Sequence, residues 1–168
     1  RAKMNRLIRV TMHGAVSVVN AVANGHGSAL GISLKVVADL SISAGRGIHL
    51  QSKQGEKLLN ILIKRALPKT VLLDNAIRVE IKSEIPVGFG LKSSSAVSSA
   101  VALAIQKFLG EEIDDVKVLN QSADASIDAG ISLTGAFDDS AACYFGGFVV
   151  TDNFSRKLIR RDPASENL

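Results

Sequence analysis

The chain has 168 residues, of which 46% are apolar and 21% charged, and its formal net charge is +4. A chain of this length can build one substantial hydrophobic core, and the composition is that of a globular domain. No apolar run reaches the length of a membrane span and no signal-peptide pattern opens the sequence, so we expect no membrane partner.

The surplus of basic residues does not form the stripe that a nucleic-acid-binding surface needs. Lysines and arginines lie in small groups near residues 1–9, 64–69 and 156–161. Aromatic residues, on which single-stranded bases stack, make up only 4% of the chain. We therefore expect no nucleic-acid partner, and the mild positive surplus instead suits small anionic ligands.

The first third of the chain is predicted to form β-strands. Its segments are rich in β-branched and apolar residues. Glycines within residues 24–27 and 45–47 predict turns between them. The expected strands cover residues 7–12, 15–22, 32–42 and 48–51.

Two further elements precede the middle of the chain. Residues 56–67 carry apolar side chains at helical spacing, and Pro68 is expected to end this helix. Residues 76–82 alternate apolar and charged side chains, which predicts a half-buried strand. That strand leads directly into a glycine-rich turn.

Helices dominate the remainder of the sequence. A run of small apolar residues that begins near Ser93 predicts a buried helix ending at Gly110. A second helix is expected over residues 114–129, with Asp114 as its cap and Val118, Leu119, Ala123 and Ile127 facing inward. A third helix should start near Asp138, before a strand at residues 148–151 that pairs with residues 157–160. Strands first and helices later indicate an α+β fold class.

The most informative stretch is the turn itself, Pro86-Val-Gly-Phe-Gly-Leu-Lys-Ser-Ser-Ser-Ala96. Gly88 and Gly90 permit a sharp turn that leaves backbone N–H groups open to a ligand. The helix that follows adds uncapped amides and the positive end of its dipole, and the serines and Lys92 add hydroxyls and a cation. This combination suits a nucleoside triphosphate with Mg²⁺, although a serine N-cap after a glycine turn is the plainer alternative.

The turn matches neither of the two common nucleotide-binding motifs. A Walker P-loop requires a glycine directly before its lysine, whereas Lys92 follows Leu91. A dinucleotide fingerprint requires glycine or alanine at the position that Ser93 occupies. The spacing resembles the second motif of the GHMP kinases, P-x-G-x-G-L-x-S-S-[AS], at every fixed position. The sequence Gly-Leu-Lys-Ser-Ser-Ser-Ala resembles in particular the form of this motif in archaeal shikimate kinases.

A second segment, Thr-Gly-Ala-Phe-Asp-Asp-Ser at residues 134–140, resembles the same branch. Two adjacent acids at a helix start are also compatible with simple helix capping. In GHMP kinases the corresponding segment carries an aspartate that takes the proton of the accepting alcohol. By this resemblance Asp138 is the catalytic residue, and Asp139 stands where relatives often have asparagine.

The resemblance implies ATP and Mg²⁺ as cofactors and a ribosomal-protein-S5-domain-2-like fold, a mixed sheet packed against helices. Ser94 is the implied metal-contacting serine. The family takes a further metal-binding acid from the preceding helix, and there we favour Asp128, with Asp124 as the alternative. The implied nucleotide-binding residues are Pro86, Val87, Gly88, Phe89, Gly90, Leu91, Lys92, Ser93, Ser94, Ser95 and Ala96.

The function implied is ATP-dependent phosphorylation of the 3-hydroxyl of shikimate. Two alternatives stay open, another GHMP kinase acting on homoserine, mevalonate or pantoate, and a non-catalytic S5-like module that binds RNA. Arg9, Arg46 and Lys92 are the candidates for binding the substrate carboxylate. Ala15 stands roughly where many relatives carry an early lysine, so this chain is assigned no such lysine.

We expect residues 1–168 to form a single N-terminal, nucleotide-binding domain. GHMP kinases continue into a second domain with a third glycine-rich motif, and nothing after Gly147 resembles that motif. The family's C-terminal domain is therefore expected to be absent, and activity of this portion alone is doubtful. The single Cys143 is interpreted as a small core residue and fits a reducing, cytoplasmic location.

Overall fold

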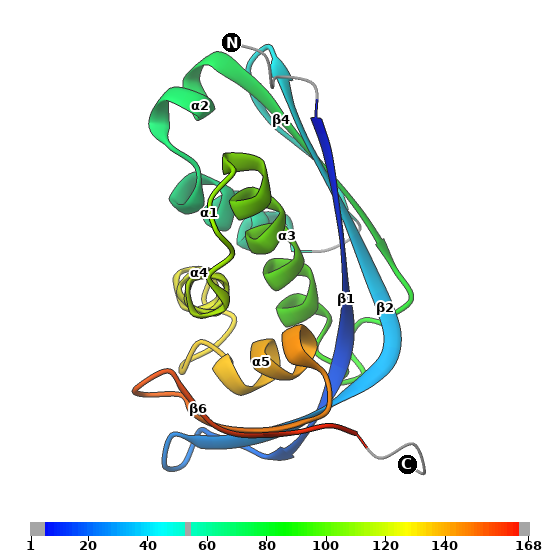
Figure 1. Ribbon diagram of the computed structural model, residues 1–168, viewed down its shortest axis with the longest axis vertical. Coiled ribbons are helices and arrows are strands. Elements are labelled where there is room, and N and C mark those ends of the chain that lie inside the picture. The colour runs from blue at the N-terminus through cyan, green and yellow to red at the C-terminus, as the bar shows by residue number, and fades with distance from the viewer. Residues whose placement is uncertain (1–5, 53–54, 165–168) are drawn as a thin grey trace.

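The computed structural model describes residues 6–52 and 55–164, so the start of the basic group at residues 1–9 lies outside the described residues. The described residues form two layers, a long curved sheet and a set of helices that fill its concave side (Figure 1). Strands β1 (Arg6–Val19) and β2 (His26–Ala44) run along most of the length of the molecule. This arrangement confirms the α+β class and the mixed sheet packed against helices.

The sheet is organised around β2, which pairs along its length with β1 on one side. On its other side the second half of β2 pairs with β4 and its first half pairs with β5. Only the β3–β4 pair is parallel among the strand pairs of the described residues. The strands are β1 (Arg6–Val19), β2 (His26–Ala44), β3 (Gly47–Gln51), β4 (Asn75–Ser83), β5 (Phe148–Asp152) and β6 (Lys157–Asp162).

The helices are stacked from the sheet outward. Helix α3 lies directly against β1 and β2, and α5 packs beside it on the same strands. Helices α1 and α4 cover α3 from outside and contact each other. Alanine and serine line most of α3, and such small side chains let helices approach closely on all sides. The helices are α1 (Glu56–Ala66), α2 (Lys69–Asp74), α3 (Ser93–Leu109), α4 (Asp115–Asp128) and α5 (Phe137–Phe145).

Several sequence predictions are confirmed at the level of single residues. Helix α3 begins at Ser93 and ends at Gly110, which adopts the left-handed conformation with φ 72°. Asp114 caps α4, because its carboxylate accepts the backbone N–H of Lys117 at 3.0 Å. Cys143 is buried in the core, and burial raises the pKa of its thiol. None of the helices in the described part of the chain is long and apolar enough to cross a membrane.

Other predictions were wrong in detail. The strands expected at 7–12 and 15–22 are one strand, because β1 passes Gly14 through a register shift and keeps its pairing with β2. The turn expected at 24–27 lies earlier, and its last two residues already belong to β2. The short helix α2 after Pro68 was not predicted. Ile127, expected to face inward, is 40% exposed.

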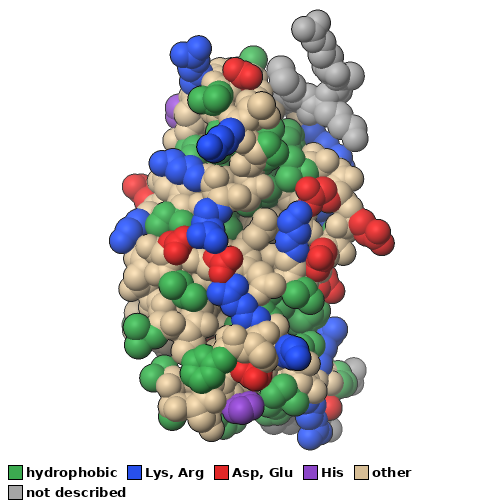
Figure 2. Space-filling model, turned by 90° about the vertical axis from the view of Figure 1, so that its left-hand side faces the viewer, with side chains coloured by type: hydrophobic (Ala, Val, Ile, Leu, Met, Phe, Trp, Pro, Cys, Tyr) green, Lys and Arg blue, Asp and Glu red, His purple; other side chains and the backbone are tan. Residues whose placement is uncertain are grey.

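The outer face of the helical layer mixes charges of both signs. Figure 2 shows acidic and basic side chains interspersed over this face, with no large patch of one sign among the coloured residues. The view agrees with the scatter of basic residues in the sequence.

Candidate functional site

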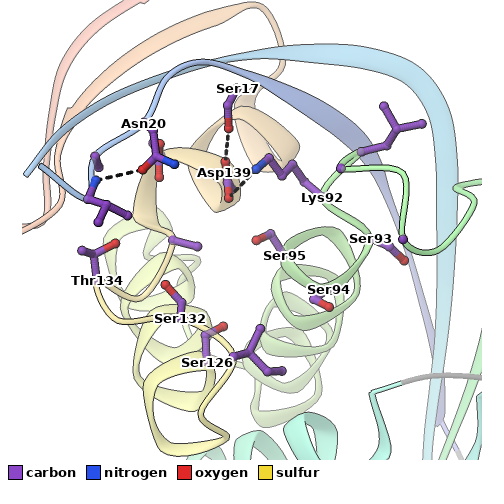
Figure 3. A pocket seen from close by; sticks show the side chains of 18 of the residues that line it. Ser17, Asn20, Lys92, Ser93, Ser94, Ser95, Ser126, Ser132, Thr134 and Asp139 are labelled. Carbon is purple, nitrogen blue, oxygen red and sulfur yellow. Dashed lines mark hydrogen bonds and ion pairs between the residues drawn. The ribbon is translucent and has the colours of Figure 1, made fainter.

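A cavity of about 350 Å³ opens where the N-terminus of α3, the N-terminus of α5 and the end of β1 meet. Figure 3 shows Ser93, Ser94 and Ser95 on one side of it, and Lys92, Asp139 and Ser17 converging at its top. Its volume lies at the lower end of the range typical of small-molecule sites. The cavity brings together the two motifs that the sequence singled out, residues 86–96 and 134–140, which are far apart along the chain.

The glycine-rich turn forms one wall of the cavity. Gly88 and Gly90 have φ of 80° and 70°, and a Cβ at either position would meet no atom within 4 Å. These glycines are therefore required by backbone conformation, and the space beside them stays open for a ligand.

Strand β1 fixes the end of this turn. The backbone N–H of Ala15 donates to the Leu91 carbonyl at 3.2 Å, and a Cβ on Gly14 would lie 2.9 Å from that oxygen. Gly14 thus allows the loop to approach the strand. Ala15, fully buried, contributes its amide to this contact.

The N-terminus of α3 is left open toward the cavity. Its N-cap is Lys92, in the left-handed conformation, and no side chain caps the first turn. The alternative interpretation of the serines as an N-cap was therefore wrong. Ser93, Ser94 and Ser95, which form the first turn of α3, all line the cavity. Uncapped amides together with the helix dipole favour an anion at this point.

The two acids of α5 occupy its first turn, and neither caps the helix, whose N-cap is Ala136. Asp138 is buried, with 4% of its surface exposed. Its Oδ1 accepts from the Asn153 side-chain amide at 2.9 Å, and its backbone N–H donates to Asn153 Oδ1 at 3.2 Å. A Cβ on Gly27 would lie 2.3 Å from Asp138 Oδ2, so Gly27 makes room for this carboxylate.

The carboxylate of Asp139 faces the cavity more openly than that of Asp138. Its Oδ2 lies 3.3 Å from the Lys92 ammonium, and its Oδ1 accepts from the Ser17 hydroxyl at 3.4 Å. Burial, reinforced by the neighbouring Asp138 charge, raises the pKa of Asp139 to about 6, while Lys92 and Ser17 act in the opposite direction. A carboxylate with such a pKa can exchange a proton near neutral pH.

The structure places Asp128 and Asp124, the acids expected to bind the metal, outside the cavity lining. Both carboxylates pair with Arg65 of α1, and Asp124 also pairs with Arg156. Ser126, which lies between them in sequence, lines the cavity. Residues two positions away from it on a helix point to the opposite side, because each residue turns the helix by about 100°. The two acids do share a face, and it is the face turned away from the site.

Two of the three candidates for a substrate carboxylate also lie elsewhere. Arg9 forms a bidentate ion pair with Asp39, with both contacts at 2.7 Å, and this interaction lowers the pKa of the Asp39 carboxyl. Both residues line a separate hollow on the sheet. Arg46 is exposed in the turn between β2 and β3. Of the three, Lys92 alone lines the cavity.

Some residues of the site carry no recognisable sequence signal. Asn153, which holds Asp138, follows β5 and is an ordinary turn asparagine by sequence. Neutral polar side chains complete the cavity wall, and they come from β1, the turn after it, α4 and the loop before α5. These residues are Ser17, Asn20, Ser126, Ser132 and Thr134, of which Thr134 begins the second segment recognised in the sequence. Only tertiary contacts assemble them.

Comparison with known proteins places the chain in a family. The model of the GHMP kinases N terminal domain matches residues 56–147, more than half of the chain. This chain belongs to the GHMP kinases. The glycine-rich turn and both acids of α5 fall inside the matched region, as the resemblance of the two motifs to GHMP kinases predicted.

Among curated GHMP relatives, two archaeal proteins named shikimate kinase are similar to this chain. The protein of Methanothermobacter thermautotrophicus is 40% identical over 156 residues, which cover 89% of this chain and 54% of the relative. That of Methanothrix thermoacetophila is 42% identical over 152 residues, covering 90% and 53%. The chain therefore spans about half the length of the curated relatives it matches.

Solved GHMP kinases have the same fold. Homoserine kinase from Cytophaga hutchinsonii superimposes with a TM-score of 0.73 at 26% identity, over 95% of this chain and 53% of that one. The Methanococcus jannaschii mevalonate kinase gives a TM-score of 0.71 at 16% identity, over 98% and 57%. At the lower identity the likeness concerns the fold alone.

Proposed function

We propose that this chain forms the nucleotide- and acceptor-binding part of an ATP-dependent kinase that phosphorylates the 3-hydroxyl of shikimate. The observation that carries the proposal is that Asp139 and the open N-terminus of α3 face one cavity. Phosphoryl transfer requires an anion cradle beside a group that positions and deprotonates an alcohol. The shikimate acceptor is supported by the names of the curated relatives.

The residues lining the cavity fit a triphosphate. Backbone amides of the glycine-rich turn and of the first turn of α3 would receive the phosphate oxygens, and the left-handed glycines leave space beside the backbone. Lys92 adds a positive charge at the same edge. We assign the segment from Pro86 to Ser95 to the nucleotide on this basis. Two residues expected to bind it, the exposed Phe89 and the buried Ala96, do not line the cavity.

Magnesium fits the same edge in part. Ser94 is exposed there and offers a hard hydroxyl oxygen, and Mg²⁺ commonly takes its remaining ligands from phosphates and water. Among the described residues no group of three or more His, Cys, Asp and Glu side chains could hold a metal ion by itself. When bound with the nucleotide, the ion would neutralise phosphate charge.

We assign the general base to Asp139 rather than to Asp138. Asp138 is bound on its side chain and its backbone by Asn153, and is the more deeply buried of the two. Asp139 has a raised pKa and reaches the open part of the cavity. Its carboxylate would take the acceptor hydroxyl proton while that oxygen bonds to the γ-phosphorus and the bond from this phosphorus to the β–γ bridging oxygen breaks, releasing ADP.

The remaining wall suits an acceptor with several hydroxyl groups. Ser17, Asn20 and Thr134 line this wall and present neutral hydrogen-bonding groups, so they add no charge that would repel or hold the phosphates. A polyhydroxylated acid such as shikimate could exchange its water contacts for these groups. This match supports the acceptor class, while the relatives' names support its identity.

A coupled assay for ADP release tests the proposal. The complete protein, supplied with Mg²⁺ and ATP, should turn over with shikimate and not with homoserine, mevalonate or pantoate. Asp139→Asn should lower turnover by about 100-fold or more, as expected for loss of a general base, with nucleotide binding retained. Activity with another acceptor, or full activity of Asp139→Asn, would refute the acceptor or the base respectively.

A further inference from the structure

Lys92 occupies a backbone conformation that side chains seldom adopt. Its φ is 62°, in the left-handed region. The two other residues of this turn with such a conformation are glycines, Gly88 and Gly90. A β-carbon at such a position is strained, so glycine would be the less costly residue. Strain kept at a cavity wall points to a use for the side chain.

The backbone around Lys92 is fixed from two sides. The preceding carbonyl, of Leu91, accepts the Ala15 amide of β1. The carbonyl of Lys92 itself begins the hydrogen-bond ladder of α3 and also receives the Cys143 thiol of α5 at 3.8 Å. The stem of the side chain therefore starts from a defined point between β1, α3 and α5. Three-quarters of the side chain is shielded, since its exposed fraction is 24%.

The charges in the cavity are unequal. Among the described residues that line it, Lys92 is the one lysine or arginine, while Asp138 and Asp139 contribute two carboxylates. Its ammonium lies 3.3 Å from Asp139 and one residue before the uncapped turn of α3, where we place the phosphates. The Lys92 ammonium thus lies between the Asp139 carboxylate and the proposed site of the phosphates.

We propose that Lys92 is a positioning residue that couples nucleotide binding to the base: its ammonium holds Asp139 in the free protein and is drawn to the terminal phosphate when nucleotide binds. This inference rests on the proposed function. An ammonium has three donors on a flexible stem, so it can turn toward a second anion while the backbone stays in place.

The consequence for the base follows from the groups that face Asp139. Two of these groups, the Asp138 carboxylate and the Cys143 thiol, belong to the same helix α5. The other two are the Lys92 ammonium at the start of α3 and the Ser17 hydroxyl of β1. Lys92 is the one member of this set that stabilises the carboxylate by its charge. Withdrawal of its ammonium raises the pKa of Asp139, so nucleotide binding makes the carboxylate a stronger base.

The test is an NMR titration of the Asp139 carboxyl in the complete protein, with and without Mg²⁺ and a non-hydrolysable ATP analogue. In the free protein, Lys92→Met should raise this pKa by about one unit. The analogue should raise it more in the wild type than in Lys92→Met, since only the wild type has an ammonium to lose. Lys64→Met, which removes an exposed lysine on α1, serves as the charge-matched control and should behave as wild type.

Two further measurements separate coupling from folding. Lys92→Gly relieves the left-handed strain, so its melting temperature should equal or exceed that of the wild type, while its turnover falls about 100-fold. In Lys92→Met, the acid limb of the kcat/KM profile should move to higher pH, a change that a purely structural role does not produce.

The outcomes distinguish this inference from the function on which it rests. If the analogue does not bind the wild type, the proposed nucleotide site fails. If the analogue binds and shikimate is turned over, but Asp139 titrates alike in the wild type and Lys92→Met, the coupling role of Lys92 is overturned and the kinase proposal stands.

Discussion

Asn153 holds Asp138 by both its backbone and its side chain, at 3.2 and 2.9 Å. The asparagine is itself buried, and its Oδ1 also accepts from the Thr151 hydroxyl at 2.7 Å. The residue after β5 is thus connected to the first turn of α5. A buried carboxylate in this position depends on its hydrogen bonds, because it has lost its water.

Asn153→Ala should therefore destabilise the fold by about 1–3 kcal/mol, the usual cost of an unsatisfied buried polar group. Urea unfolding at neutral pH measures this change. Asn60→Ala, which removes an amide on the surface of α1, is the control and should stay within about 0.5 kcal/mol of wild type. Equal stability of both variants would show that Asp138 does not need Asn153.

Gly27→Ala should displace Asp138. The new Cβ would lie 2.3 Å from Asp138 Oδ2 and 2.7 Å from its Cγ, and Asn153 prevents the carboxylate from moving aside freely. Since Asp139 is the next residue of the same helix turn, we expect turnover to fall by about 100-fold, as small misplacements of reacting groups do. His26→Ala, at the exposed neighbouring position of β2, should retain wild-type turnover in the same assay.

Asp139→Asn should stabilise the protein above pH 6. Because the folded-state pKa of Asp139 is raised to about 6 from 3.8, its ionisation opposes folding, and the associated stability is present at low pH and is lost as the pH rises through 6. The amide removes this loss, so the gain should be near zero at about pH 3, below the unfolded-state pKa, and reach roughly 1–3 kcal/mol at pH 8. Thermal unfolding across this pH range checks it, and a gain independent of pH would show that ionisation of Asp139 is not its cause.

Asp128→Asn should leave the magnesium requirement unchanged. Its carboxylate pairs with Arg65 on the far side of α4, and nearly half of its side chain is exposed, so turnover should stay within about twofold of wild type. Ser94→Ala, by contrast, should raise the Mg²⁺ concentration for half-maximal turnover several-fold, because its hydroxyl is the proposed contact. A strong metal defect in Asp128→Asn would restore this aspartate as a metal ligand.

The elements of the fold were largely predictable, for a local reason. Helix spacing in residues 56–67, the alternation in 76–82 and the Gly110 stop depend on neighbours a few residues apart, and these elements appear as expected. The single strand β1 was missed, because pairing with β2 carries it past Gly14. Helix α2, with only six residues, has too little periodicity to be recognised.

The sequence by itself determined the family and the two segments that meet at the site, because glycine conformations and adjacent acids are local properties of the chain. Tertiary structure alone decided the surroundings of each acid at the site. In the folded protein Asp124 and Asp128 form ion pairs with Arg65. Asp138 accepts a hydrogen bond from Asn153, and Asp139 forms an ion pair with Lys92. Burial and the distance between charges control how an acid behaves, and both arise from contacts between residues far apart in sequence.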